Sequence, residues 1–323
     1  MARPGSPADG RQRLFVVVNP HASAVDPSLR SLVVAALSSR FEVTALDTER
    51  PGSATELARE AVQQGAAAVV AVGGDGTVNE IAGGLAGTRT ALVPLPGGSQ
   101  NVYAKLLGLP ADVVEATSLV LRLPEPLPVR SVDLGTVNDR VFAFCAGAGI
   151  DADTVEIVDA TPERKARWRE WYYMATVGQV AARRYVRRPP EITVTAGGRS
   201  VRGITVLIQN GPSYTYAGER PIEACPEVGL DDGKLSAAVL LKGLAGLPTV
   251  ALRLYSRKLS AERHRGIENF DHVDSLSVRA APGETFAIQA DGDFMGRFPQ
   301  ASFGVLPGAL SVVDTRQADG VTR

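Results

Sequence analysis

The first hundred residues alternate short, uninterrupted apolar runs with longer stretches rich in alanine and leucine. The apolar runs are LFVVVNP, FEVTAL, AAAVVAVGGDGT and TALVPLP, and residues 29–39, 55–64 and 78–85 separate them. Apolar strands that lack polar alternation and are separated by helices are typical of a parallel sheet covered on both faces. Residues 14–127 are therefore predicted to form a doubly wound α/β domain, in which a ligand lies beyond the carboxyl ends of the strands.

A second pattern begins after the proline-rich segment LPEPLPVR. Shorter alternating runs, among them RVFAFCAGA, RGITVLIQN, KLSAAVLL and TFAIQA, predict a mainly antiparallel, β-sandwich-like domain over residues 128–304. A helical insertion is expected at residues 161–188, and residues 305–314 can return to the first domain. Residues 1–13 and 315–323 are polar or rich in proline and glycine, and we expect disordered tails there.

Composition narrows the class of protein. The formal net charge is −1, which gives no general attraction to nucleic acid. No apolar stretch reaches the roughly 18 to 20 residues needed to span a bilayer. The chain has only two cysteines and no signal-like start, so we expect a cytoplasmic protein with at most peripheral contact with a membrane.

The strongest local motif is the turn Gly73-Gly74-Asp75-Gly76-Thr77, between a buried strand and a helix. Glycines admit a phosphate close to the backbone, and the helix N-terminus adds partial positive charge. Neither a dinucleotide-binding nor a P-loop pattern is present. The alternative is a tight turn capped by Asp75 or Thr77 with no ligand.

A second glycine turn, Pro96-Gly97-Gly98-Ser99-Gln100-Asn101, also follows an apolar strand. It places a hydroxyl and an amide at the same edge of the sheet, and two such turns favour a polyphosphate ligand. Ordinary N-capping by Ser99 or Asn101 is compatible with this interpretation.

Eight motifs occur in a fixed order: VVNPHAS, Thr48 with ERPGSATELA, GGDGTVNE, PLPGGSQNVYAKLLGLP, VDLG, GAGIDA, GLDDGKL and QADGD. With these motifs in this order, the chain resembles the diacylglycerol kinase catalytic family. That family includes bacterial diacylglycerol kinases and sphingosine and ceramide kinases. The resemblance covers residues 14–314. It implies an ATP-dependent lipid kinase that acts with Mg²⁺. The first expected acceptor is diacylglycerol, which would give phosphatidic acid. A sphingoid base or another glycolipid is the next acceptor.

The resemblance also implies which residues bind the nucleotide. They are Asn19, Thr48, Gly73, Gly74, Asp75, Gly76, Thr77, Val78, Asn79, Ser99 and Asn101. Asp75 would act on the phosphates through Mg²⁺, directly or through water. Two positions depart from the family pattern, because Ser99 replaces a threonine and Ser23 replaces a glycine.

A second acidic segment, Gly229-Leu-Asp-Asp-Gly-Lys-Leu235, can form either an Asx-type turn or a site for a hard cation. By resemblance it would hold a structural Mg²⁺ through the Asp232 carboxylate and the backbone carbonyls of Gly229 and Lys234. This ion would be linked by water to the region of Asp75, and the catalytic cleft would lie between the domains.

The third acidic segment is Gln289-Ala-Asp-Gly-Asp293. In the family a glutamate in the last position accepts the proton of the lipid hydroxyl, so the resemblance makes Asp293 the catalytic base. Aspartate is shorter by one methylene group, about 1.5 Å. Asp291 is the substitute, and the alternative is a hairpin turn with no catalytic role.

Residues 161–190 combine both tryptophans, three tyrosines and eight basic residues. Such a segment suits the anionic inner surface of a membrane. It equally suits an amphipathic helix packed on the β domain through Trp168, Trp171, Tyr172 and Ala175. Nucleic-acid binding fits less well, and a homodimer remains open.

The rival functions are an NAD kinase, which shares only GGDGT, and a family member that binds nucleotide or lipid but is catalytically weak.

Overall fold

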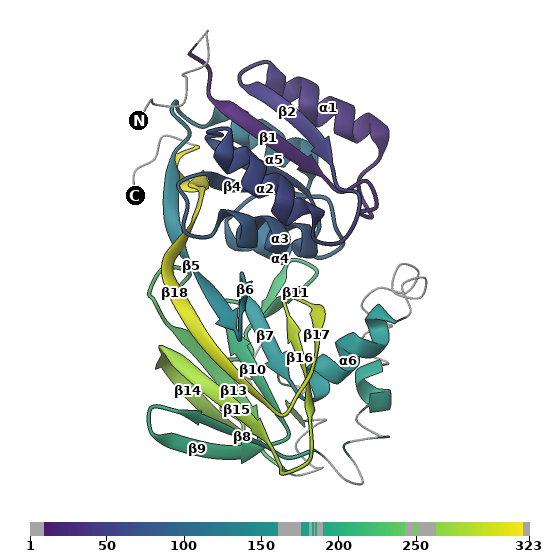
Figure 1. Ribbon diagram of the computed structural model, residues 1–323, viewed down its shortest axis with the longest axis vertical. Coiled ribbons are helices and arrows are strands. Elements are labelled where there is room, and N and C mark those ends of the chain that lie inside the picture. The colour runs from purple at the N-terminus through teal and green to yellow at the C-terminus, as the bar shows by residue number, and fades with distance from the viewer. Residues whose placement is uncertain are drawn as a thin grey trace. The chain divides into compact units, whose positions relative to one another are not determined.

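A computed structural model describes residues 10–160, 176–180, 183, 185, 190–242, 249, 250, 253 and 263–318 (Figure 1). The chain forms two compact units, an α/β unit of Met1–Val132 with Gly308–Arg323 and a β unit of Asp133–Pro307. Of the segment 161–190, residues 176–180 are helical, whereas residues 161–175, with Trp168, Trp171, Tyr172 and Ala175, lie outside the described residues.

The α/β unit is built on a parallel sheet in the order β2-β1-β3-β4. The strands are β1 (Arg13–Val18), β2 (Glu42–Asp47), β3 (Ala68–Gly73) and β4 (Ala91–Pro96). Every residue of β3 and β4 is buried, as expected for central strands covered on both faces. Strand β1 begins at Arg13, which the sequence had placed in the disordered tail.

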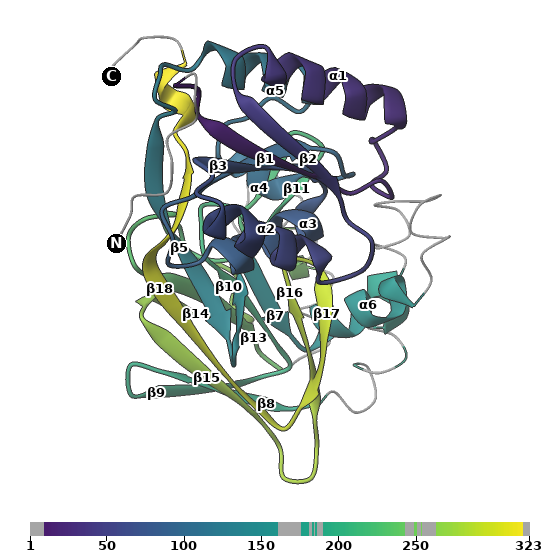
Figure 2. The same ribbon diagram turned by 45° about the horizontal axis from the view of Figure 1, so that its top comes forward.

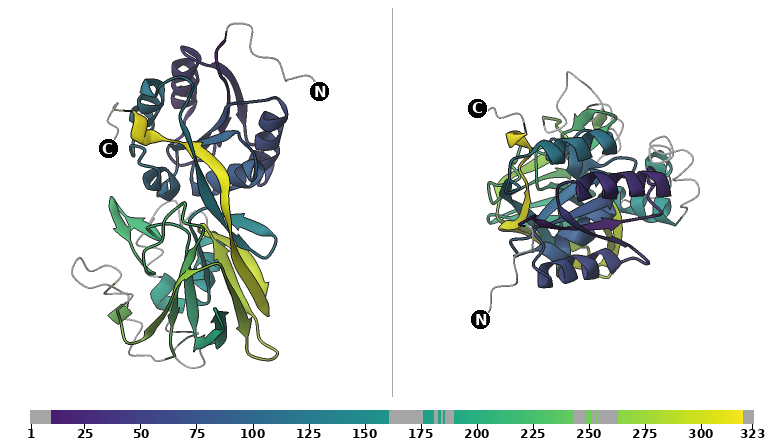
Figure 3. Two further views of the ribbon diagram at one scale, coloured as in Figure 1. Left: turned by 90° about the vertical axis from the view of Figure 1, so that its left-hand side faces the viewer. Right: turned by 90° about the horizontal axis from the view of Figure 1, so that it is seen from above.

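Helices cover both faces of this sheet (Figure 3). Helices α2 (Ser53–Gln63) and α3 (Asp75–Leu85) pack together on one face, while α1 (Pro27–Ser38) and α5 (Val113–Arg122) lie on the other; α4 (Val102–Leu106) follows β4. This arrangement confirms the predicted doubly wound fold. It brings the loops after β1, β2, β3 and β4 to the same edge of the sheet.

The end of the chain also contributes to the α/β unit. Strand β18 (Gln300–Val313) begins in the β unit. Near its end it pairs in parallel with β4, where Val312 lies opposite Leu92. A 3₁₀ turn, η2 (Thr315–Gln317), follows, and Arg316 forms an ion pair with Asp314 at 2.7 Å. The expectation of a disordered tail from residue 315 is therefore wrong over residues 315–317, because the Thr315 hydroxyl donates to the Leu107 carbonyl and the Arg316 and Gln317 side chains bond Asp314.

The β unit contains antiparallel strands whose apolar faces share one core. One sheet has the order β14-β13-β10-β7-β16-β17, and β8, β9, β15 and β18 pair in the other (Figure 1). The bounds are β5 (Val129–Val137), β6 (Arg140–Phe142), β7 (Cys145–Ala148), β8 (Ile192–Ala196), β9 (Arg199–Gly203), β10 (Thr205–Gln209), β11 (Thr215–Ala217), β12 (Arg220–Ile222), β13 (Leu235–Leu240), β14 (Ile267–Val273), β15 (Ser275–Ala280), β16 (Phe286–Ala290) and β17 (Asp293–Phe298). The predicted β-sandwich-like architecture is confirmed.

Helix α6 (Ile150–Asp159) packs against β16, β17 and β7 within the β unit (Figure 2). Arg297 on β17 bonds Asp153 and Glu156 of this helix at 2.5 Å each. Asp153 also accepts a hydrogen bond from the Tyr185 hydroxyl at 2.5 Å. These contacts fix the strand that begins at Asp293.

Candidate functional site

The two glycine turns of the α/β unit pack against each other backbone to backbone. The Gly97 N–H donates to the Gly73 carbonyl at 2.9 Å. A Cβ at Gly98 would lie 2.6 Å from the Gly74 Cα, and one at Gly97 would lie 2.9 Å from the Gly73 nitrogen. The glycines are therefore required for the packing of one turn on the other, in addition to any approach of a phosphate.

Helix α3 begins directly at the first of these turns. Gly74 is its N-cap residue and has no side chain, so neither Asp75 nor Thr77 caps the helix as the alternative interpretation supposed. Thr77 instead accepts a hydrogen bond from the Asn19 amide at 3.1 Å. The N–H groups in the first turn of a helix have no partner within that helix, so they can bind a phosphate.

Asp75 is the first residue of α3 and is partly buried. Its Oδ1 accepts the Tyr103 N–H at 3.1 Å, which links α3 to α4. Burial raises the pKa of the Asp75 carboxyl, although the N–H groups of Tyr103 and Val102, the charge of Lys105 and the N–H of Asn101 oppose the shift. A carboxylate in this position is stabilised by an added cation, so the residue suits an ATP-bound Mg²⁺.

The other predicted nucleotide residues of the α/β unit have different roles. The backbone N–H groups of Asn19 and Thr48 bond Val72 and Val18, which fixes both residues at the carboxyl ends of strands. Val78 is buried in the core, so only its backbone can reach a ligand. Ser99 is exposed on its turn.

Asn101 is used inside the second glycine turn. It adopts φ 51° and ψ 46°, and its side chain both accepts from the Gly98 N–H and donates to the Gly98 carbonyl, each at 2.8 Å. The side chain makes no N-cap hydrogen bond to α4, contrary to the capping alternative. Its observed role is to close the turn that packs on Gly74.

A Gly98→Ala variant should bind ATP more weakly, because its Cβ would displace the backbone of Gly74 and with it the start of α3. We expect a rise in the KM for ATP of about 10-fold to 100-fold, the scale of a 1 Å misplacement. Gly178→Ala is the matched control, since Gly178 is exposed on a helix and its Cβ would have no neighbour within 4 Å. An unchanged KM in Gly98→Ala would show that the packing of the turns is not critical.

In the β unit, Asp291 anchors a hairpin. Its Oδ2 accepts the Ala143 N–H at 2.6 Å, and its Oδ1 accepts the Phe144 and Cys145 N–H groups at 3.0 Å each. Asp291 and Gly292 have φ values of 49° and 85°, so they form the two-residue turn that the sequence offered as the alternative. Both oxygens of Asp291 bond to backbone amides, which favours a structural role over a catalytic one.

Asp293 follows this turn as the first residue of β17 and is exposed. The turn before it is held from a second side, because the Gly292 N–H donates to Gln289 Oε1 at 2.9 Å. Gln289 is buried, and its Nε2 donates to Asp151 at 2.9 Å and to the Tyr214 hydroxyl at 2.7 Å. The sequence did not identify Tyr214, and only the neighbouring GAGIDA motif pointed to Asp151.

The predicted metal segment forms the Asx-type turn. Asp232 accepts the Gly229 N–H at 2.8 Å and the Lys234 N–H at 3.0 Å. Among the described residues no group of three or more His, Cys, Asp or Glu side chains is placed to hold a metal ion. The predicted set is of a different kind, because it contains one carboxylate and two backbone carbonyls.

Further oxygen atoms lie beside this turn. The buried Asp133 accepts the Gly233 N–H at 2.6 Å, and its carbonyl accepts from Asn210 at 3.1 Å. Asn210 is fully buried, and its Oδ1 has no hydrogen-bond partner among the described residues. Carboxylate oxygens are ligands that Mg²⁺ prefers, and Asp133 and Asp232 supply them beside Gly233 and Lys234. Asp133 was recognised only as part of the VDLG motif.

Comparison with known proteins decides the family. Residues 13–137 match the diacylglycerol kinase catalytic domain, and residues 145–314 match the YegS C-terminal NAD kinase beta sandwich-like domain. A Chromohalobacter salexigens protein named "Probable lipid kinase YegS-like" is 34% identical over 222 residues, which cover 68% of each chain. The chain belongs to the diacylglycerol kinase catalytic family of lipid kinases.

Other relatives of this lipid kinase cover more of its length. The diacylglycerol kinase of Staphylococcus carnosus is 25% identical and spans 90% of this chain and 91% of its own. A crystal structure from Bacillus anthracis strain Sterne superposes with a TM-score of 0.75 at 25% identity and covers 94% of this chain and 95% of that one. In the described part of the lipid kinase, no helix combines the length and apolarity needed to cross a bilayer.

Proposed function

We propose that this lipid kinase transfers the γ-phosphoryl group of ATP to a hydroxyl of diacylglycerol and gives phosphatidic acid. The observation that carries the proposal is the pair of packed glycine turns at the start of α3, with Asp75 beside them, in a chain of this family. The names of the Staphylococcus carnosus and Bacillus subtilis relatives support the acceptor. A sphingoid base or another glycolipid is the alternative acceptor.

The proposed mechanism assigns the nucleotide to the α/β unit. Backbone N–H groups at the start of α3 and in the turn of Gly97 and Gly98 would bind phosphate oxygens. Asn19 and Thr48, at the ends of their strands, would bind the rest of the nucleotide. Asp75 would hold Mg²⁺, which would neutralise charge on the β- and γ-phosphates.

The acceptor chemistry is assigned to the β unit. The lipid hydroxyl oxygen forms a bond to the γ-phosphorus while the bond from that phosphorus to the bridging oxygen breaks, and ADP leaves with the electron pair. The hydroxyl proton passes to the Asp293 carboxylate and then to solvent. Gly229, Asp232 and Lys234, with Asp133 beside them, would hold a structural Mg²⁺. Because the acceptor is a lipid, the proposal includes peripheral contact with the inner membrane surface.

The test is transfer of labelled γ-phosphate from ATP with Mg²⁺ to micellar diacylglycerol, sphingosine and ceramide, and to NAD in solution. Labelling of diacylglycerol supports the proposal in full, and labelling of another lipid would correct the acceptor. Labelling of NAD alone would overturn the lipid assignment. ATP binding without transfer to any acceptor would indicate a catalytically weak binding protein. The shorter Asp293 side chain would then be the first cause to test.

A further inference from the structure

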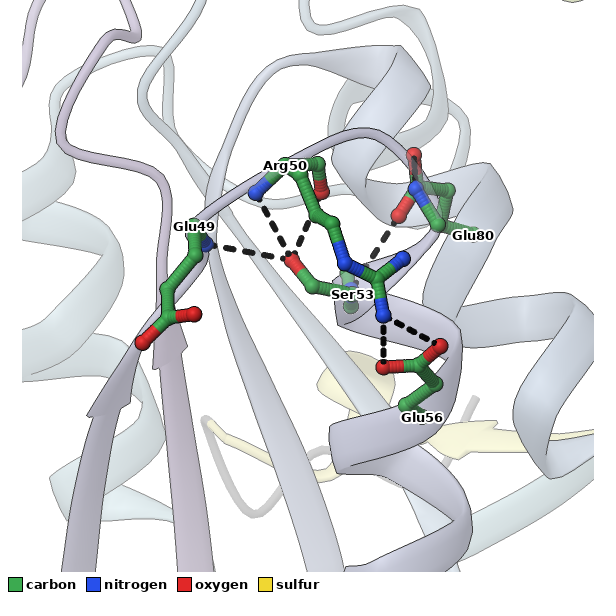
Figure 4. Close-up of polar contacts among 7 residues, drawn as sticks. Glu49, Arg50, Ser53, Glu56 and Glu80 are labelled. Carbon is green, nitrogen blue, oxygen red and sulfur yellow. Dashed lines mark hydrogen bonds and ion pairs between the residues drawn. The ribbon is translucent and has the colours of Figure 1, made fainter.

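The first turn of helix α2 has no capping side chain of its own. Its N-cap residue is Gly52, with φ 88°. Ser53, the first residue of the helix, uses its hydroxyl within the preceding loop instead, where Oγ donates to the Arg50 carbonyl at 2.7 Å and accepts the Glu49 N–H at 3.2 Å (Figure 4). The N–H groups at the start of α2 therefore need an acceptor from elsewhere.

Glu80 of the neighbouring helix α3 supplies that acceptor. Its Oε1 accepts the Gly52 N–H at 2.8 Å, and its Oε2 accepts the Ala54 N–H at 3.2 Å. Its backbone carbonyl accepts the Thr55 hydroxyl at 2.8 Å. One residue of α3 thus makes three hydrogen bonds to the start of α2, and its negative charge lies at the positive end of that helix.

The close packing of the two helices makes this contact feasible. A Cβ at Gly84, one turn after Glu80, would lie 2.7 Å from the Ala58 Cβ and 2.8 Å from the Thr55 carbonyl oxygen. Only glycine allows this separation of the backbones. Glu80 can therefore reach the N-terminus of α2 with both carboxylate oxygens.

The contact joins two loops to which the proposed function assigns the nucleotide. Thr48 lies at the start of the loop that ends at Gly52, and Asp75 lies at the start of the helix that carries Glu80. We propose that Glu80 is a positioning residue, which holds the Thr48 loop in register with the phosphate-binding start of α3. The inference rests on the proposed function for the identity of the ligand, ATP.

A matched control lies in the first turn of α2, the helix whose start Glu80 caps. There, Glu56 bonds Arg50 with both carboxylate oxygens at 2.8 Å. Both of these side chains are about 60% exposed, so solvent screens the ion pair and it contributes little. Glu56→Gln makes the same chemical change as Glu80→Gln, but it removes an exposed contact and should leave the loop in place.

The experiment measures ATP binding by titration, and the KM for ATP and kcat by phosphoryl transfer, for both variants. Glu80→Gln places an amide NH₂ against one of the two backbone N–H donors, so we expect the Kd and KM for ATP to rise about tenfold, the size of a lost capping interaction. The kcat at saturating ATP should stay within about threefold of the original. Glu56→Gln should change neither quantity by more than about twofold.

The outcomes separate positioning from mere stabilisation. A lower folded fraction reduces the apparent kcat and leaves the KM unchanged, so a fall in kcat at constant KM would overturn the inference, as would unchanged ATP binding. If Glu80→Gln fails to fold, Thr55→Val, which removes only the Thr55 bond to Glu80, must raise the Kd for ATP by about twofold to fivefold, or the inference is wrong. Because ATP binding is measured without an acceptor, failure of the lipid assignment is seen separately.

Discussion

An Asp75→Asn variant should lose kinase activity without losing stability. We expect kcat to fall by about 10²-fold to 10³-fold, since a neutral amide cannot hold Mg²⁺ on the phosphates as charge moves in the transition state. Asparagine retains the Oδ1 acceptor for the Tyr103 N–H, so the link between α3 and α4 is kept. The thermal midpoint of the protein without ligand should be equal to or higher than that of the original.

The stability part of this prediction follows from the direction of the pKa shift. Burial raises the pKa of Asp75, so the folded protein holds this proton more tightly than the unfolded chain does. The contribution of Asp75 to stability is present below its unfolded pKa, about 3.9, and is lost as the pH rises through the raised value. At neutral pH the ionised carboxylate is therefore unfavourable for folding, and asparagine removes that cost.

The measurement is thermal unfolding of both proteins from pH 4 to pH 8 without Mg²⁺ or nucleotide, with kcat measured in parallel. The stability advantage of Asp75→Asn should grow with pH and reach a plateau above the raised pKa. Glu56→Asn is a suitable control, because that carboxylate is exposed. A variant that is inactive and also markedly less stable at neutral pH would contradict the prediction, because Asp75 would then be a structural residue.

The parallel sheet and the two glycine turns were predictable from the sequence because they depend on local patterns. Strands β3 and β4 are continuous apolar runs, and each is followed at once by glycines and a helix. A strand buried on both faces needs no polar alternation, so its position in the centre of a parallel sheet follows from its composition. The candidate nucleotide residues at the ends of these strands follow from the same rule.

The contacts that hold these turns could not be predicted, because they join residues that are distant in the sequence. Glu80 caps a helix whose N-cap residue, Gly52, lies 28 residues earlier, and no local spacing signals that pairing. Asp291 bonds amides about 148 residues away at Ala143. At Asn101 a local signal was present but misleading. An asparagine before a helix suggests a cap, whereas its positive φ turns the side chain back to Gly98. Tertiary geometry decides each of these roles.

An Asp293→Asn variant should lower kcat by about 10²-fold to 10⁴-fold, because it removes the proposed acceptor of the lipid hydroxyl proton. The side chain is exposed at the start of β17, and asparagine has nearly the same shape, so the thermal midpoint should hardly change.

Asp291→Asn should have the opposite effects, a loss of stability with little loss of kcat. It places an amide NH₂ against buried backbone N–H donors and should cost about 1–3 kcal/mol of stability or more, with most of the kcat of the folded fraction retained.

Asp293→Glu then measures how well the hairpin compensates for the shorter side chain. The turn before Asp293 is held by Asp291 on one side and by Gln289 on the other, so the backbone position is fixed and the added 1.5 Å or so moves the carboxylate itself. We expect kcat to change by about tenfold, upward if the aspartate falls short of the hydroxyl and downward if the hairpin already places it in reach. Equal kcat values for aspartate, glutamate and asparagine at this position would exclude Asp293 as the base, because a proton acceptor must respond to charge and to reach.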